Sequence, residues 1–401
     1  MEEKVLNQDK ELELDEIIAG VKAFSMAEEE PEEEEQEEFF VPNPPAKKGS
    51  VFGKIMGVVA KILIVVLVTV LLLAGTLYGV MYILAKGPSP TARDLFVHSV
   101  RETSAVGFLA NLFFTEEEIA LMSGDDGVEE YIETDTSLVV IPQPTEKNEG
   151  DIQEGPQPDA WGLVDEDGDG IIIETVKGQG YSGFMMVILD PSRVIMGSKP
   201  NSFGYRGYTV AEMAQEFDAV AAINAGGFED PNGQGNGSVP NTLVVYEGNV
   251  YFESSGTRTG FVGIDSNHIL HVATTITSAE IKARDIQYGV CFGPVLVANG
   301  EPCEMNVSGV NPRTAIGQRS DGAILMLVID GRQVISLGAT MEDLVNIMME
   351  YGAVNACNLD GGSSSLMWFE GEYVNNCASV IGIRPVPTTF LVLKEGVKDN
   401  G

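Results

Sequence analysis

The chain has 401 residues, enough for one large domain or two ordinary ones with extensions, and its 60 acidic and 24 basic residues give a formal net charge of -36. Lysine and arginine are sparse and scattered, so the chain offers no basic patch to a nucleic acid and this class of partner is excluded.

Residues 1–50 are predicted to form an acidic, largely disordered cytoplasmic tail. A block of glutamates over residues 28–38 repels itself and stays solvated. Apolar residues at helical spacing over 11–24 predict a short helix, which could bind a cytoplasmic partner.

An uncharged apolar run from Ile62 to Ala85 follows the tail. It exceeds the roughly 20 residues that a helix needs to cross a bilayer, and we predict a transmembrane helix over residues 55–85. Lysines on its N-terminal side place that side in the cytoplasm. A cleaved signal peptide is the alternative, but the run is too long and begins too far from the N-terminus. The sequence therefore predicts a single-pass cell-membrane protein whose C-terminal domain is extracytoplasmic.

Residues 88–141 are predicted to form a short helical stalk. Apolar residues recur at helical spacing over 91–114, and Thr115 with Glu118 forms a capping box that opens a second helix. Residues 142–158 are rich in Pro, Gln, Glu and Gly, a composition typical of a linker.

Residues 159–396 are predicted to form an α+β domain, a sheet-dominated mixed fold with few helices. Short β-type runs separated by turn signals predict strands at 171–173, 184–189, 243–246, 295–297 and 324–329. Two helices are expected, over 209–217 and 340–351, each with a threonine as N-cap.

Four cysteines, Cys291, Cys303, Cys357 and Cys377, lie in this domain. Their spacing does not suggest a zinc site, and the sequence leaves both disulfides and buried free thiols open.

No cofactor or metal is firmly implied by the sequence. Asp165, Asp167 and Asp169 begin like a calcium loop, with a glycine in the sixth position. The twelfth position is Val176 rather than glutamate, so an acidic turn entering a strand is favoured and a calcium site is the alternative.

The most informative segment, residues 358–365, follows an apolar run and contains Asn358, Asp360, Gly361, Gly362 and three serines. Glycines allow close approach to the main chain, and loops at strand ends commonly carry chemistry. A polar hairpin turn is the structural alternative.

Two further segments share this pattern of polar residues at a strand end. Residues 221–230 deliver Asn224, then Gly226 and Gly227, an aromatic residue and two carboxylates, although a long flexible hairpin loop would explain them too. Arg313 precedes a run of small residues and Arg332 follows another strand, and arginines can hold an anion by a bidentate fork.

In this order, the segments 224–228, 312–317, 330–332 and 358–363 resemble the phosphodiester glycosidase family, and the resemblance covers roughly residues 180–395. The chain departs from the family pattern at Glu229, where a second phenylalanine is common, and at Ser363, where a third glycine is common.

The resemblance implies cleavage of a sugar-1-phosphodiester at the glycosidic bond, a reaction that needs carboxylates and donors for the phosphate. Asp360 is the candidate for the essential carboxylate, which acts as nucleophile or base. The second catalytic carboxylate is expected to be Glu229, Asp230 or Asp330. Asn224 and Asn358 are the candidates to bind sugar hydroxyls, and Arg313 and Arg332 the candidates to bind the phosphate. The main-chain N–H groups of Gly361, Gly362 and Ser363 are expected to form an anion nest. Three further substrate-binding candidates are Thr314, Gly226 and Gly227.

The resemblance thus implies a phosphorylated glycan or sugar-phosphodiester as substrate, located outside the membrane, for example in a surface glycopolymer. One alternative is a glycan-binding or envelope-assembly protein that uses the same cleft without turnover. Another is hydrolysis at phosphorus rather than at the anomeric carbon.

Overall fold

The computed structural model describes residues 51–103, 106–123, 132–141, 156–252, 260–306, 308–379 and 382–396. The predicted cytoplasmic tail, with its expected helix, and most of the predicted linker lie outside these residues. The chain divides into two compact units, residues 1–71 and 72–401, and each is described by itself.

The apolar run forms one continuous helix, α2 (Val51–Lys86). Within the described ranges it is the one helix long and apolar enough to cross a membrane, over Ile55–Lys86. By length and composition it is compatible with a membrane anchor or with a signal sequence.

Three short helices follow α2: α3 (Pro90–Arg101), α4 (Phe108–Asn111) and α5 (Glu116–Ser123). We expected helical structure throughout residues 91–114, but a turn after Arg101 separates α3 from α4. The predicted capping box is present, since Thr115 and Glu118 each accept a hydrogen bond from the other's main-chain N–H. A small apolar cluster that includes Ala85, Val97 and Ala110 packs these helices against the end of α2.

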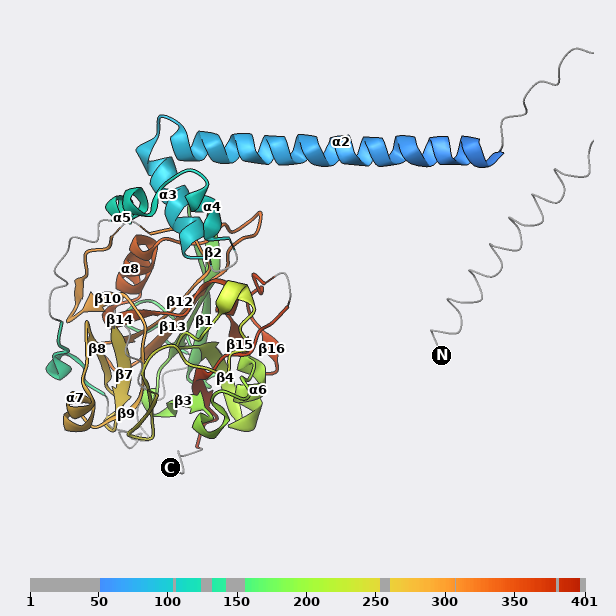
Figure 1. Ribbon diagram of the computed structural model, residues 1–401. Coiled ribbons are helices and arrows are strands. Elements are labelled where there is room, and N and C mark those ends of the chain that lie inside the picture. Colours follow the sequence, from blue (N-terminus) through green and yellow to red (C-terminus); the bar gives the residue numbers. More distant parts are fainter. Residues whose placement is uncertain are drawn as a thin grey trace, which may run out of the picture. The chain divides into compact units, whose positions relative to one another are not determined.

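The expected sheet-dominated α+β fold is confirmed, with three antiparallel sheets (Figure 1). The largest has the order β1-β2-β13-β12-β14-β10-β11 and comprises Ile171–Gly178, Tyr181–Ile188, Ile324–Ile329, Arg313–Arg319, Ala353–Leu359, Val295–Ala298 and Glu301–Pro302. The second has the order β16-β15-β4-β17-β3 and comprises Glu372–Tyr373, Met367–Phe369, Ala219–Asn224, Thr388–Leu393 and Val194–Ser198. The third has the order β6-β5-β9-β7-β8 and comprises Asn249–Phe252, Val244–Tyr246, Ile286–Cys291, Phe261–Asp265 and Leu270–Ala273.

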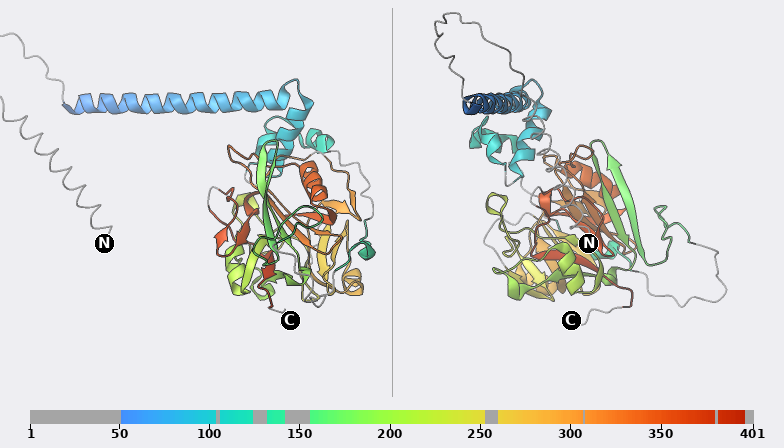
Figure 2. Two further views of the ribbon diagram at one scale, coloured as in Figure 1. Left: turned by 180° about the vertical axis from the view of Figure 1, so that it is seen from behind. Right: turned by 90° about the vertical axis from the view of Figure 1, so that its right-hand side faces the viewer.

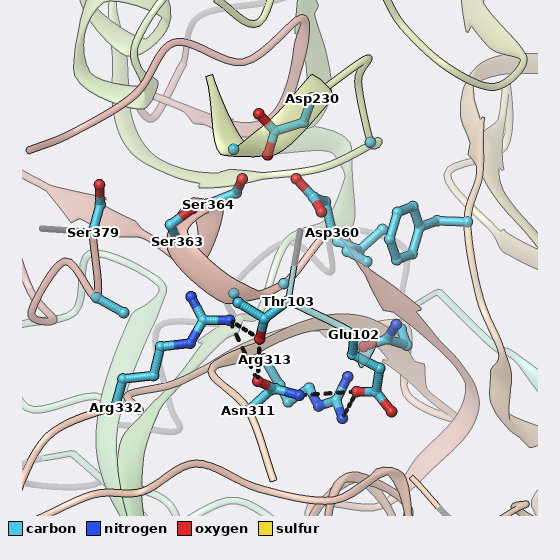
Figure 3. Close-up of a pocket in the computed structure, with 18 of the residues that line it drawn as sticks. Glu102, Thr103, Asp230, Asn311, Arg313, Arg332, Asp360, Ser363, Ser364 and Ser379 are labelled. Atoms are coloured by element: carbon cyan, nitrogen blue, oxygen red, sulfur yellow. Dashed lines mark hydrogen bonds and ion pairs between the residues drawn. The ribbon is translucent and has the colours of Figure 1, made fainter. Parts of the chain in front are cut away.

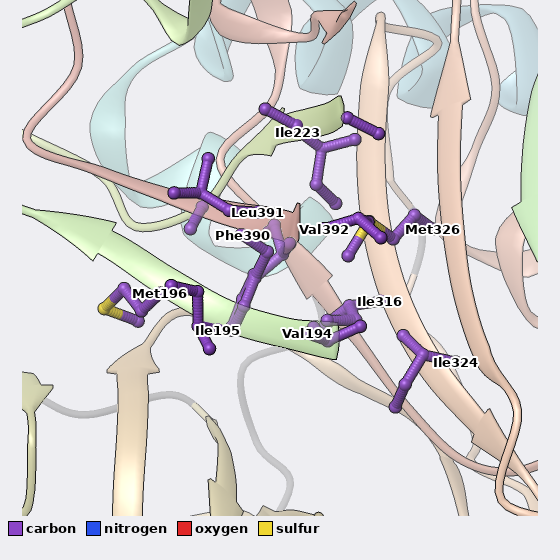
Figure 4. Close-up of a cluster of buried hydrophobic side chains, with 14 of the residues drawn as sticks. Val194, Ile195, Met196, Ile223, Ile316, Ile324, Met326, Phe390, Leu391 and Val392 are labelled. Carbon is purple, nitrogen blue, oxygen red and sulfur yellow. The ribbon is translucent and has the colours of Figure 1, made fainter. Parts of the chain in front are cut away.

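Every residue of β13 is buried, because this strand is covered on both faces of the largest sheet. Ile324, Met326 and Val328 join the main core, where Figure 4 shows Ile324 and Met326 near side chains of β3, β4 and β17. The alternate residues Leu325 and Leu327 face a second core. Successive side chains of a strand point to opposite faces, so a continuous apolar run is what a doubly covered strand requires.

The second core is closed by α8 (Met341–Glu350), which lies beside β10 and β14 (Figure 1). This helix and α6 (Val210–Glu216) are the two that the sequence predicted, each opened by a threonine capping box. The sequence missed α7 (Ser278–Ala283), a six-residue helix that buries Ile281 alone. One apolar contact in so short a segment leaves no periodic pattern to detect.

Short 3-10 turns complete the fold, and the last of them forms part of the pocket described below: η1 (Thr136–Leu138), η2 (Pro191–Arg193), η3 (Pro200–Ser202), η4 (Pro231–Gly233) and η5 (Gly362–Ser364). None of the four cysteines forms a disulfide in the described structure.

Residues 132–141 pack against the sheets rather than forming part of a helical stalk. Glu133 forms a β-bridge with Ala273, and the Val140 N–H donates to the Ser320 carbonyl at 2.8 Å. The region of residues 132–141 therefore contributes contacts to the folded domain.

The long β1–β2 hairpin lies at one edge of the largest sheet, as the strand order requires and as the two further views show (Figure 2).

Replacing Thr340 with alanine should lower the free energy of unfolding by about 1 kcal/mol, since its hydroxyl accepts from the Asp343 N–H and caps α8. Urea titration of the purified protein measures the change. Thr340→Ser keeps the hydroxyl and should retain most of the stability. Equal losses in the two variants would contradict the capping role.

Candidate active site

A pocket of about 910 Å³ lies where the two motif-bearing strand ends, β4 and β14, meet the turn after α3 (Figure 3). This volume suits a small-molecule ligand. The lining combines the 358–364 turn, the segment after β4, the arginines at the start of β12 and in the loop after β13, and five residues at and after the end of α3: Ser99, Val100, Glu102, Thr103 and Val106. The sequence predicted the first three contributors but not the last.

Asn224 joins the strand ends at the base of the pocket. Its side-chain N–H donates to the Asp360 carbonyl at 2.6 Å, and its side-chain oxygen accepts from the Thr314 hydroxyl at 2.9 Å and the Leu366 N–H at 3.1 Å. The residue is fully buried and lies outside the pocket lining. Asn224 and Thr314, both proposed to bind substrate, are thus placed as the framework of the site.

Asp360 presents its carboxyl group to the pocket. Enclosure of this carboxyl raises the pKa of Asp360 to about 7, although the residue keeps some exposure. A hydrogen bond from Ser364, the charge of Arg384 and the Gly361 N–H oppose the rise, and the charge of Asp230 adds to it. A carboxyl group with a pKa near neutrality can exchange a proton under ordinary conditions, as a general acid or base must.

Asp230 is the second carboxylate of the pocket, and in Figure 3 its side chain points toward that of Asp360. It makes a bidentate ion pair with Arg384, with nitrogen–oxygen distances of 3.0 and 3.1 Å. It also accepts from the Gly235 N–H at 2.7 Å. These partners hold the carboxylate in one orientation.

The structure places the other two carboxylate candidates away from the pocket. Asp330 is buried and accepts from the side chain of Asn375 at 3.1 Å and the N–H of Asn376 at 3.0 Å. Glu229 is exposed. Neither residue lines the pocket, so we retain only Asp230 as a partner for Asp360.

Arg313 is neutralised by a residue that the sequence did not suggest. Its guanidinium pairs with Glu102, from the turn after α3, at 2.6 Å, and it also donates to the carbonyls of Gly309 and Ala339. The Glu102 carboxylate accepts in addition from the side chain of Asn311 at 3.0 Å. No sequence motif identifies Glu102, because its partners lie more than 200 positions away.

Arg332 has no carboxylate within ion-pair distance among the described residues. It donates to the Thr103 hydroxyl at 2.8 Å and lies against Gly362, where its Nη2 is 3.3 Å from the position that a Cβ would take. Partial burial of its guanidinium, and then the charges of Arg313 and Arg384, lower the pKa of Arg332, although the residue as a whole stays exposed. The guanidinium of Arg332 is therefore less occupied by protein partners than that of Arg313.

The glycines of the turn after β14 shape the wall of the pocket beside Arg332. Gly361 and Gly362 line the pocket with Ser363, but the Gly362 N–H donates to the Pro312 carbonyl at 2.9 Å and is not available to an anion. Gly362 has φ +64°, a conformation that favours glycine, and a Cβ there would meet the Arg332 guanidinium.

Gly227 also lines the pocket, and a Cβ on it would lie 2.8 Å from the ring of Phe292. Gly226 lies outside the lining, and its N–H donates to the Thr388 hydroxyl at 2.9 Å. Phe228 and Phe292, which the sequence did not single out as ligand-binding residues, add aromatic surface to the pocket.

Asn358 lines the pocket with an unused acceptor. Its side-chain N–H donates to the Gly293 carbonyl at 2.6 Å, whereas its side-chain oxygen is buried without a partner in the described structure. Buried acceptors are almost always paired, so this oxygen is a candidate to accept from a ligand hydroxyl.

The three aspartates near the start of β1 lie apart from this pocket. One carboxylate oxygen from each of Asp165, Asp167 and Asp169 lies within 4.8 Å of the others, so the group could hold a metal ion. Burial, then the charges of Asp167 and Asp165, raise the pKa of Asp169. The same carboxylates also accept from main-chain N–H groups, the arrangement of an acidic turn.

Residues 217–393 match the family model described as phosphodiester glycosidase, which confirms the resemblance. The match covers less than half of the chain and characterises this part as a phosphodiester glycosidase-like domain.

Similar proteins are found among curated sequences and solved structures. The SPbeta prophage-derived uncharacterized protein YomE of Bacillus subtilis (strain 168) is 31% identical over 200 residues, which are 48% of this chain and 31% of that protein. The chain thus spans about a third of the length of this curated relative.

Two solved structures resemble the chain at lower identity. The zebrafish N-acetylglucosamine-1-phosphodiester alpha-N-acetylglucosaminidase catalytic domain has a TM-score of 0.45 and 19% identity, covering 56% of this chain and 82% of that one. A hypothetical protein from Synechocystis has a TM-score of 0.41 and 15% identity, covering 56% of this chain and 62% of that one.

The raised pKa of Asp360 predicts a pH dependence of stability. The folded state keeps a proton that the unfolded chain loses near the ordinary value of 3.8, so the free energy of unfolding should fall as pH rises from about 4 to about 7. Urea titrations of the wild type and Asp360→Asn across this interval isolate the effect, since other acids titrate equally in both. The wild type should lose stability relative to the variant as pH rises; parallel curves would contradict the shift.

Proposed function

We propose that the chain is a membrane-anchored extracytoplasmic hydrolase that cleaves the glycosidic bond of sugar-1-phosphodiesters, for example in surface glycopolymers. The observation that carries this proposal is that one pocket contains both the Asp360 carboxyl group, whose pKa is about 7, and the Arg332 guanidinium, which has no carboxylate partner in the described structure. The family of residues 217–393 supports the reaction class.

In this reaction a water oxygen forms a bond to the anomeric carbon while the bond from that carbon to the phosphate oxygen breaks. The electron pair leaves with the phosphate, and the products are a free sugar and a phosphomonoester. Asp360, as carboxylate, takes the proton of the attacking water or attacks the anomeric carbon itself before water releases the sugar. The carboxylate of Asp230 lies beside it and favours the positive charge that develops on the sugar ring.

The departing phosphate gains negative charge in the transition state, and a fixed cation nearby stabilises it. Arg332 is suited to this role because no carboxylate in the described structure competes for it. The aromatic rings of Phe228 and Phe292 provide apolar surface for the sugar, and the Asn358 side-chain oxygen accepts from one of its hydroxyls.

The membrane placement rests on α2 and on the lysines before it. With α2 across the bilayer and its N-terminal side in the cytoplasm, the glycosidase domain lies outside the cell membrane. The substrate is then a glycan or glycan precursor that is met on that side.

Asp360→Asn should abolish turnover of every sugar-1-phosphodiester that the wild type cleaves, because an amide can neither take the proton nor attack. A panel of hexose and N-acetylhexosamine 1-phosphodiesters, with product analysis, measures this. Free reducing sugar plus phosphomonoester is expected, whereas sugar-1-phosphate would mean hydrolysis at phosphorus. Turnover retained in the variant, or ligand binding without turnover in the wild type, would overturn the assignment.

The two arginines should respond differently to replacement. Arg332→Met should raise KM or lower kcat enough to reduce kcat/KM about 10- to 100-fold, the loss of one charge-assisted contact, with the thermal midpoint unchanged. Arg313→Met removes the buried partner of a partly exposed Glu102 and should lower the free energy of unfolding by about 1 to 3 kcal/mol. Steady-state kinetics and thermal unfolding of both variants separate the roles, and a stable, fully active Arg332→Met protein would contradict them.

A further inference from the structure

Three large apolar side chains are exposed together on the loop between β13 and α8. Val334, Ile335 and Leu337 are 101%, 78% and 60% exposed. Single exposed apolar residues are normal, but three within four positions form a local patch that water solvates poorly. Arg332 belongs to the same loop, so the patch starts two residues beyond the proposed phosphate site.

A second exposed apolar pair lies on α4. Phe108 and Leu112 are 64% and 56% exposed, and α4 begins two residues after Val106, which lines the pocket. The hydrogen bond of 2.8 Å from Arg332 to the Thr103 hydroxyl joins the two segments. The two exposed apolar segments therefore follow, along the chain, two pocket residues that are hydrogen-bonded to each other, Arg332 and Thr103.

The end of α2 is packed against Phe113, which lies two residues after α4. The rings of Tyr78 and Tyr82 lie 5.7 and 6.5 Å from the ring of Phe113, measured between centroids. Tyrosines near the end of an apolar helix mark the membrane–water interface. When α2 crosses a bilayer, α4 is accordingly held at the interface.

We propose that the substrate of this pocket is a glycosyl phospholipid, a sugar-1-phosphate whose second ester carries a membrane-embedded hydrocarbon chain. The sugar occupies the pocket beside Asp360 and the phosphate contacts Arg332. The hydrocarbon chain passes between the loop of Val334 to Leu337 and α4 into the bilayer. This inference rests on the proposed function and on α2 spanning a membrane.

A lipid fits these surfaces better than a partner protein does. The apolar residues belong to segments that α2 tethers to the bilayer, so hydrocarbon is always within reach. The water attack described above then releases the free sugar and leaves a lipid phosphomonoester in the membrane.

The test uses the full chain in phosphatidylcholine nanodiscs and two substrates with the same sugar, one with a methyl aglycone and one with a dialkylglycerol aglycone. For the wild type, kcat/KM should be at least about tenfold higher with the lipid aglycone than with the methyl aglycone. This ratio is smaller than the gain expected from burying several methylene groups of the hydrocarbon chain. A variant with Val334→Ser, Ile335→Ser and Leu337→Ser should lose most of this advantage while its kcat/KM for the methyl substrate stays unchanged.

Val140→Ser is the matched control, since Val140 is 68% exposed and lies outside the pocket lining. It should keep the preference for the lipid substrate. Equal rates for the two substrates in the wild type, or an undiminished preference in the triple variant, would overturn the inference and leave the proposed function intact. Failure to cleave either substrate, or any member of the soluble panel, would instead remove the proposed function.

Discussion

The buried side chain of Asn224 is the contact on which the geometry of the site depends. One amide binds the carbonyl of Asp360, the hydroxyl of Thr314 and the N–H of Leu366, so it ties the ends of β4, β12 and β14 and the segment before β15 to one point. Inside a protein such a network is rigid when it is fully satisfied. The carboxyl group of Asp360 can therefore be held in an enclosed position that raises its pKa, because its own main chain cannot move away.

The charges around the pocket are arranged so that one cation remains uncompensated. Arg384 is paired with Asp230 and Arg313 with Glu102, whereas Arg332 has only neutral partners within the described structure. Glu102 comes from the turn after α3, well before the matched family region begins at residue 217. The helices that follow the apolar span thus do more than connect it to the domain, since they decide which arginine is open to a ligand.

Much of the fold could be predicted from local sequence. The apolar run of β13 and the capping boxes of α6 and α8 follow from neighbouring residues, and the structure confirms these elements. The break after Arg101 and the short α7 could not, because neither leaves a periodic signal. In the site, Asp360 and the glycine turn were recognisable as polar residues at the end of a buried strand. The roles of Asn224 and Arg313 depended on partners far away in the chain.

By itself, the sequence determined the apolar helix, the sheet-dominated domain and the positions of the carboxylates, glycines and arginines that characterise the family. These features depend on residue type and on spacing within short segments, which local physical rules capture. Only the tertiary structure decided which of those residues face the pocket. It paired Glu102 with Arg313 and Asp230 with Arg384, and it enclosed Asp360 enough to raise its pKa to about 7. Ion pairing and burial are properties of residues brought together by the fold, and separation along the chain does not reveal them.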